Sequence, residues 1–169
     1  MAYTYKLIAS ALVGSGGAAS LDFTSIPQTY TNLCILASPR STNAFTGENI
    51  YIRFNDSTSS YNWVNFYGTG SGSASLQSGS DNQSGTAVGA SATASFFGNV
   101  CIYIPEYTTS KYKTLISDSN VENNATRGDN TLWGTMWSNT AAITSIKLFP
   151  STGVWAQDSN AYLYGITSS

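Results

Sequence analysis

The residues best suited to chemistry gather around VENNATRGDNTLW, Val121 to Trp133. This stretch contains Arg127-Gly128-Asp129, the tripeptide that many cell-adhesion proteins present to integrins. Acidic and amide side chains also alternate here, at a spacing that suggests a calcium loop: Asp118, Asn120, Glu122 and Asn124. The segment could therefore be an adhesion motif, a metal site or an ordinary polar loop.

A calcium site does not fit the available ligands. A helix-flanked calcium loop that starts at Asp118 needs glycine at its sixth position, where Asn123 stands. It also needs a bidentate glutamate at the twelfth position, where Asp129 stands. No helical pattern flanks the segment, so we expect neither a metal ion nor a cofactor.

The adhesion motif is short and occurs often by chance. We expect it to be exposed, because it lies in a polar segment. Integrin binding also requires an animal extracellular setting, which nothing in the sequence supports. Gly128, Asp129 and Asn130 are good turn residues. We therefore predict a polar loop between two strands, whose tip could contact a partner through Asn123, Asn124 and Arg127.

The chain contains no histidine, which excludes Ser-His-Asp and Cys-His catalysis and every histidine metal site. Carboxylate pairs remain possible, but a glycosidase needs two carboxyl groups about 5 to 9.5 Å apart. Asp118 and Glu122 would lie about 13 Å apart in an extended chain, and the other acids are dispersed singly. We therefore expect no enzymatic activity.

Aromatic residues offer a broader functional hypothesis. They concentrate in YNWVNFYG and LWGTMW, and the candidates for contact with a partner or a glycan are Tyr61, Trp63, Tyr67, Trp133 and Trp137. Trp and Tyr are enriched at interfaces and can stack on sugar faces. The alternative is that they are core or subunit-interface residues, which we favour for Trp133 and Trp137.

Charge and cysteine content narrow the classes further. Seven basic residues are scattered through the chain and the net charge is −2, so a nucleic-acid partner is not expected. Cys34 and Cys101 both lie in apolar runs. Buried free thiols are favoured there over a disulfide between strands, because two cysteines are too few to indicate a disulfide scaffold.

The elements that must position these residues are strands. The chain of 169 residues fits one domain, 1–169, and charged residues make up only 9% of it. Period-2 alternation recurs between Gly, Ser, Asn and Pro clusters, which predicts an all-β fold, a jelly-roll-like antiparallel β-sandwich of about ten strands. The expected strands are Tyr3–Val13, Ser20–Thr24, Leu33–Ser38, Ile50–Asn55, Trp63–Gly68, Val100–Glu106, Tyr112–Ser117, Leu132–Trp137, Ile143–Phe149 and Ala161–Thr167.

Two connections have distinct signatures. Residues 68–95 are small, polar and Gly/Ser-rich, so we predict a long surface loop there. EYTTSKYK indicates a hairpin that brings Glu106 near Lys113.

The N-terminal run resembles a signal peptide, with Lys6 before LIASALVG. Since Met1 is retained, we expect a protein made in the cytoplasm without secretion. No run reaches the length of a transmembrane helix, so no membrane insertion is expected. The first expected strand follows directly, so we expect no shaft before the domain.

Four segments carry a family resemblance: GGAASLDFTSIPQTYTNL, IYIRFNDSTSSYNW, NVCIYIPEYTTSKYKTLISDSNVENNAT and MWSNTAAITSIKLFPSTGVWAQDSNAYLYGI. They resemble small virion surface proteins of tailed bacteriophages, especially marine ones, and the resemblance covers nearly the whole chain. Its most specific parts are SLDFTSIPQTYTNL and WSNTAAITSI. It implies a jelly-roll-like sandwich with a structural or adhesive role on the particle, and no catalytic residues to carry over.

We therefore expect a non-enzymatic structural protein on the virion surface. It would be a capsid decoration protein or a small tail-fibre or knob subunit that contacts other virion proteins and forms a homotrimer. The alternative is a module at a fibre tip that recognises a host-surface glycan for attachment.

Overall fold

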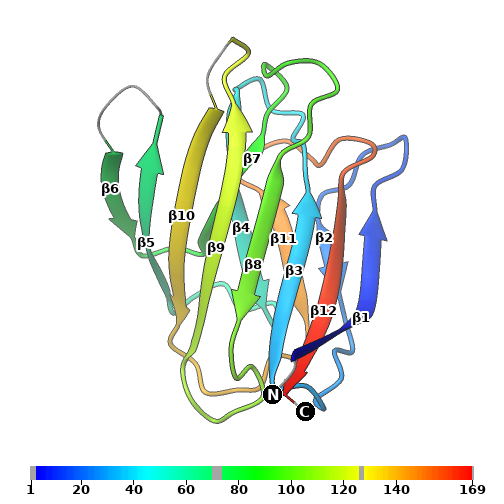
Figure 1. Ribbon diagram of the computed structural model, residues 1–169, viewed down its shortest axis with the longest axis vertical. Helices are drawn as coiled ribbons and strands as arrows, with labels where there is room; N and C mark the ends of the chain where they lie inside the picture. The colour runs from blue at the N-terminus through cyan, green and yellow to red at the C-terminus, as the bar shows by residue number, and fades with distance from the viewer. Residues whose placement is uncertain (1–2, 70–73, 126–127, 169) are drawn as a thin grey trace.

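The computed structural model describes residues 3–69, 74–125 and 128–168 and shows two packed antiparallel sheets, with no helix among these residues (Figure 1). The strands are β1 (Tyr3–Leu12), β2 (Leu21–Phe23), β3 (Asn32–Ser38), β4 (Gly47–Phe54), β5 (Tyr61–Gly68), β6 (Ala74–Gly79), β7 (Gln83–Val88), β8 (Asn99–Ile104), β9 (Lys113–Glu122), β10 (Gly128–Trp137), β11 (Ile146–Pro150) and β12 (Asn160–Ser168). The larger sheet has the order β1-β12-β3-β8-β9-β10-β5-β6, and the smaller has the order β2-β11-β4-β7.

Eight of these strands have the topology of a jelly roll. They pair in a nested manner, first with last, as β1–β12, β2–β11, β3–β8 and β4–β7. Successive pairs alternate between the two sheets, so the orders β1-β12-β3-β8 and β2-β11-β4-β7 face each other. The predicted jelly-roll-like antiparallel sandwich is confirmed.

Two inserted hairpins widen the larger sheet. β5–β6 lies between β4 and β7 in the chain, and β9–β10 lies between β8 and β11. β9 pairs with β8, and β10 pairs with β5, so all four strands continue one sheet. The smaller sheet ends at β7, so β5 and β6 extend beyond it, at the left of Figure 1.

The hydrophobic core fills the space between the two jelly-roll sheets. Alternate residues of β4 and β8 point into it, among them Ile50, Ile52 and Ile102. Burying an aliphatic or aromatic side chain of this size contributes about 1.5–3 kcal/mol. The predicted faces of β4, β8 and β11 are thus correct, because period-2 alternation reports directly which side is buried.

The long loop predicted at residues 68–95 is wrong. This segment contains β6 and β7, and β7 is buried at every position except Gln83. Its side chains are too small and polar to show an apolar alternation, but backbone ladders do not depend on side-chain type. Gly85 brings β7 close to the core, since a Cβ there would lie 3.4 Å from Ile50 Cδ1.

The adhesion-motif segment also differs from the expected exposed loop. β9 continues to Glu122 and β10 begins at Gly128, so Asp129 is a strand residue and only 7% exposed. Arg127 lies outside the described residues. Asn120 pairs with Asn130 across the two strands, with their side-chain amides 3.1 Å apart. The polar residues of β9 form a strand here because every second residue, such as Ser119 and Val121, faces inward and is buried.

The predicted approach of Glu106 to Lys113 is wrong as well. Glu106 forms its ion pair with exposed Lys111, at 3.1 Å. Lys113 starts β9 with its side chain pointing inward and is 1% exposed. Cys34 and Cys101 are both free thiols on neighbouring strands, as expected, but only Cys34 is buried and Cys101 is half-buried. Burial raises the pKa of Cys34 to about 12. Among the described residues, no helix is long and apolar enough to cross a membrane.

Candidate functional site

Two of the five candidate aromatic residues belong to the core. Tyr61 and Trp137 stack with ring centroids 6.0 Å apart, and Phe54 packs against both. The Tyr61 hydroxyl accepts a hydrogen bond from the Phe54 amide at 2.8 Å, and Trp137 Nε1 donates to Ser57 Oγ. Both rings are almost fully buried, so neither is placed to contact a ligand or a partner.

The other three aromatic candidates lie together under the extension of the larger sheet. Trp133 of β10 and Tyr67 of β5 line a hollow of about 370 Å³ beside β7, the edge strand of the smaller sheet. We call this hollow the overhang cleft. Trp63 packs against Trp133 with ring centroids 4.9 Å apart. Trp63 lies directly over Gly79 of β6, where any Cβ would fall 2.6 Å from its ring. The structure therefore groups these residues on the inner face of β5 and β10.

The cleft has a polar lining that the sequence alone did not reveal. Strand register places Trp133, Asn65 and Gln77 in one row across β10, β5 and β6. The Asn65 Oδ1 and Trp133 Nε1 atoms are buried and have no hydrogen-bond partner among the described residues. Asp129 accepts a hydrogen bond from the Tyr67 hydroxyl at 2.8 Å. The cleft thus combines indole and phenol rings with amide groups and one carboxylate.

Hydroxyl groups close the floor of the cleft. Ser119 Oγ and Thr131 Oγ1 lie 2.6 Å apart, and Thr131 Oγ1 donates to Thr86 Oγ1 at 3.3 Å. Ser119 Oγ also accepts from the Thr86 amide at 3.0 Å. These contacts join β7 to β9 and β10 where the apolar core ends, and they hold the floor in one arrangement.

The remaining candidates lie at the end of the β9–β10 hairpin, apart from the aromatic residues. Asn124 has a left-handed backbone with a φ of 58°, and its backbone N–H donates to Glu122 Oε2 at 2.7 Å. Asn123 is half-buried next to it. Glu122 also accepts from Thr93 of the β7–β8 connection, so this hairpin is tied to a neighbouring loop. Within the described ranges, no three His, Cys, Asp or Glu residues gather as a metal site would require.

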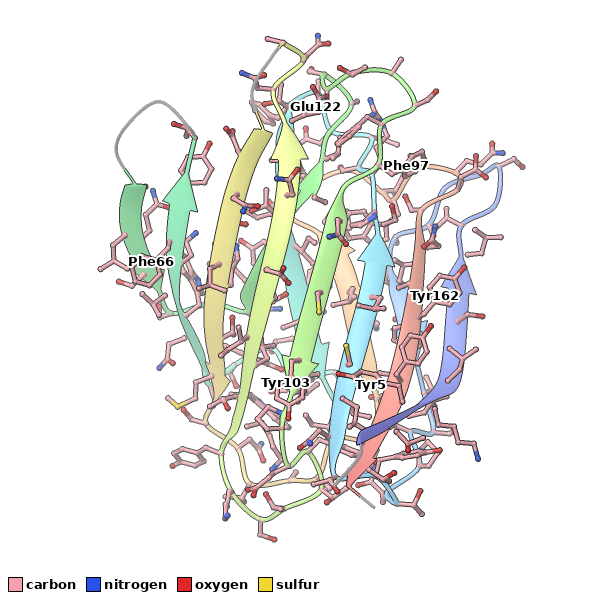
Figure 2. The ribbon with its side chains drawn as sticks, viewed as in Figure 1. Tyr5, Phe66, Phe97, Tyr103, Glu122 and Tyr162 are labelled. Atoms are coloured by element: carbon pink, nitrogen blue, oxygen red, sulfur yellow. The ribbon has the colours of Figure 1, made fainter. Side chains whose placement is uncertain are left out.

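A second surface stands out on the outer face of the larger sheet. Two adjacent rows of outward-facing residues cross its strands, and their apolar members form what we call the outer apolar band: Leu7, Leu36, Val64, Phe66, Leu76, Tyr103, Ile116, Leu132, Tyr162 and Tyr164. Figure 2 shows Phe66, Tyr103 and Tyr162 on the viewer's side of this sheet. Leu76 and Ile116 are 63% and 60% exposed, so the band is open to solvent.

The band is nearly free of charge. Asp118, which lies between Leu132 and Cys101, is the one charged side chain in the two described rows. Gly134 leaves a shallow apolar hollow of about 820 Å³ between Val64 and Ile116. A contiguous apolar surface of this kind marks an interaction site, whereas single exposed apolar residues do not.

The outer face of the smaller sheet has the opposite character. Lys147 pairs across the strands with Asp22 and Arg53, and its Nζ lies 2.8 Å from Asp56 Oδ1. The Arg53 guanidinium lies over the Phe149 ring at 4.6 Å. This face mixes charged side chains with the stacked Tyr51–Phe149 pair, whereas the outer apolar band has one charged side chain in its two described rows.

No protein-family model matches this chain, and no curated protein or solved structure matches it either.

The sequence contains weak signals for both surfaces. In YNWVNFYG, Trp63, Asn65 and Tyr67 share one strand face and Val64 and Phe66 share the other. Both faces of this strand therefore carry large side chains, as a strand that belongs to the cleft on one side and to the band on the other should. Nothing in the sequence indicates Gln77, since its place in the cleft depends on the unpredicted strand β6.

Proposed function

We propose that this protein is a non-enzymatic structural component of the exterior of a tailed-phage virion. It is a capsid decoration protein or a small fibre or knob subunit, and it assembles with other copies of itself through the outer apolar band. The observation that carries this proposal is the outer apolar band itself, in whose two described rows Asp118 is the one charged side chain. The resemblance of the sequence to small phage virion surface proteins supports the virion setting.

The band is large enough to form the centre of an interface. Eight strands spaced about 4.8 Å apart span about 34 Å, and two rows of outward side chains cover about 14 Å along each strand. The product, about 480 Å², is a little over half of the roughly 800 Å² per partner that a standard protein interface buries, so residues that flank the band would complete the interface.

The position of Asp118 favours a cyclic assembly over a face-to-face dimer. Asp118 lies on β9, near the middle of the larger sheet. A two-fold axis through the middle of the band would bring two copies of this carboxylate together, and like charges oppose each other. In a cyclic trimer the band meets a different surface of its neighbour. We therefore propose a homotrimer.

The virion setting is tested by locating the chain in a particle. Virions produced by a phage that encodes this sequence should be purified through a density gradient, and their proteins identified by mass spectrometry. An antibody against the folded protein should then label the particle surface in electron micrographs. Absence of the chain from purified virions would contradict the proposal, and so would labelling only after the particles are disrupted.

A further inference from the structure

We propose that the overhang cleft is a binding site for a neutral saccharide unit. The site lies on the inner face of β5, β6 and β10, opposite to the outer apolar band. Its volume of about 370 Å³ is near the lower end of the range for small-molecule sites, which suits one or two sugar units. This binding role is independent of the assembly role, since the two surfaces share no residue.

The first argument comes from two buried polar atoms. Asn65 and Trp133 are 3% and 2% exposed, and Asn65 Oδ1 and Trp133 Nε1 lack hydrogen-bond partners among the described residues. Buried polar atoms in native proteins are nearly always hydrogen-bonded. The two residues are a directly opposed cross-strand pair in the lining of the cleft, so the cleft offers one acceptor and one donor. Hydroxyl groups satisfy both kinds of atom, because a hydroxyl donates to a carbonyl oxygen and accepts from an indole N–H.

The second argument comes from charge. The described lining of the cleft includes one carboxylate, Asp129, and no lysine or arginine. A phosphate, sulfate or uronic acid would place a second negative charge beside this carboxylate, and like charges oppose each other. A calcium ion takes about six to eight oxygen ligands, and the single carboxylate of this lining supplies little of the negative charge that sets calcium affinity. Neutral ligands with many hydroxyl groups fit the lining best.

The third argument comes from the aromatic and amide groups together. The half-buried Tyr67 ring provides apolar surface against which the C–H face of a sugar can pack. Trp133 is only 2% exposed and contributes its indole N–H rather than an open ring face. Gln77, Gln83 and Asn49 add further donors and acceptors to the lining. Gln77 and Phe45 are exposed and therefore lie at the mouth of the cleft. Entry requires movement of a lining side chain, since both unpartnered atoms are shielded from solvent.

The test is a titration of the full chain with neutral and anionic sugars, followed by NMR of the four tryptophan indole N–H groups. The probes are glucose, galactose, mannose and N-acetylglucosamine, with glucuronic acid and inorganic phosphate as anionic controls. The spectrum of Trp133→Phe assigns the Trp133 signal. We expect at least one neutral sugar to shift this signal saturably, and neither anion to do so.

Two substitutions in β5 test whether the sugar binds at Asn65. Asn65→Leu removes the acceptor and should weaken sugar binding about tenfold or more, the effect of about one lost hydrogen bond. Asn62→Leu alters an exposed residue of the same strand, on its other face, and should bind as the wild type does. Circular dichroism confirms that each variant folds. The proposal is overturned if no neutral sugar shifts the Trp133 signal, or if Asn65→Leu binds as well as Asn62→Leu. Failure of self-assembly would leave these results unchanged.

Discussion

Lys113 is a buried lysine whose ammonium group binds backbone carbonyls. Its Nζ donates to the carbonyl oxygens of Thr109 and Lys111, both at 2.6 Å, and to that of Thr140 at 3.5 Å. Burial lowers the pKa of Lys113. The three carbonyls belong to the β8–β9 and β10–β11 connections, so one side chain joins two loops at the same end of the sandwich.

Replacement of Lys113 with methionine should destabilise the fold. The variant keeps the apolar stem but leaves the carbonyls without their donor, at a cost of about 1–3 kcal/mol in the free energy of unfolding. Urea unfolding followed by tryptophan fluorescence measures this change. Lys111→Met is the matched control, since Lys111 forms only an exposed ion pair with Glu106 and should change stability by about 1 kcal/mol or less. Equal effects of the two substitutions would contradict the assigned role of Lys113.

At the scale of elements, the β7–β8 connection is held by two side chains from other parts of the fold. The Arg40 guanidinium donates to four carbonyl oxygens of this connection, including those of Thr93 and Phe96. Glu122 of β9 accepts from the Thr93 amide and hydroxyl. The connection is thereby fixed against the β9–β10 hairpin without a strand of its own.

The Glu122 tether should respond to acid. Burial opposes ionisation, but hydrogen bonds from Thr93 and Asn124 prevail and lower the pKa of Glu122. Because the folded pKa lies below the unfolded one, the tether is intact above the usual glutamate pKa and is lost as the pH falls through the folded value. The amide NMR signals of Thr93 and Asn124 should therefore shift together in this acidic range. The same two signals should show no such step in Glu122→Gln, and a step that persists there would contradict the assignment.

Element prediction from the sequence succeeded where side chains differ strongly between faces. In β4, Ile50 and Ile52 alternate with more polar residues, and in β8 Val100 and Ile102 do the same. The predicted inward faces of both strands are therefore correct. β6 and β7 gave no signal, because serine, threonine, alanine and glycine fit loops and strands alike. The cleft could not be predicted for the same reason, since Gln77 of β6 and Thr86 of β7 form part of its lining.

At the scale of the molecule, two hairpin insertions turn a jelly roll into a protein with two distinct surfaces. The hairpins β5–β6 and β9–β10 double the larger sheet from four strands to eight. On the outer side they extend the apolar band, and on the inner side they overhang the edge of β7 and form the cleft. The eight jelly-roll strands alone would carry neither the full band nor the cleft.

Sedimentation velocity of the purified chain over a range of concentrations tests the central claim that the outer apolar band is an assembly interface. Wild-type protein should sediment as a trimer, at three times the chain mass of 17.9 kDa. Leu132→Lys places a charge in the band and should shift the protein to monomer, while Tyr112→Lys, at an exposed aromatic residue outside the band, should leave the trimer intact. A wild-type protein that stays monomeric at every concentration, or a Leu132→Lys variant that assembles as well as Tyr112→Lys, would contradict the claim.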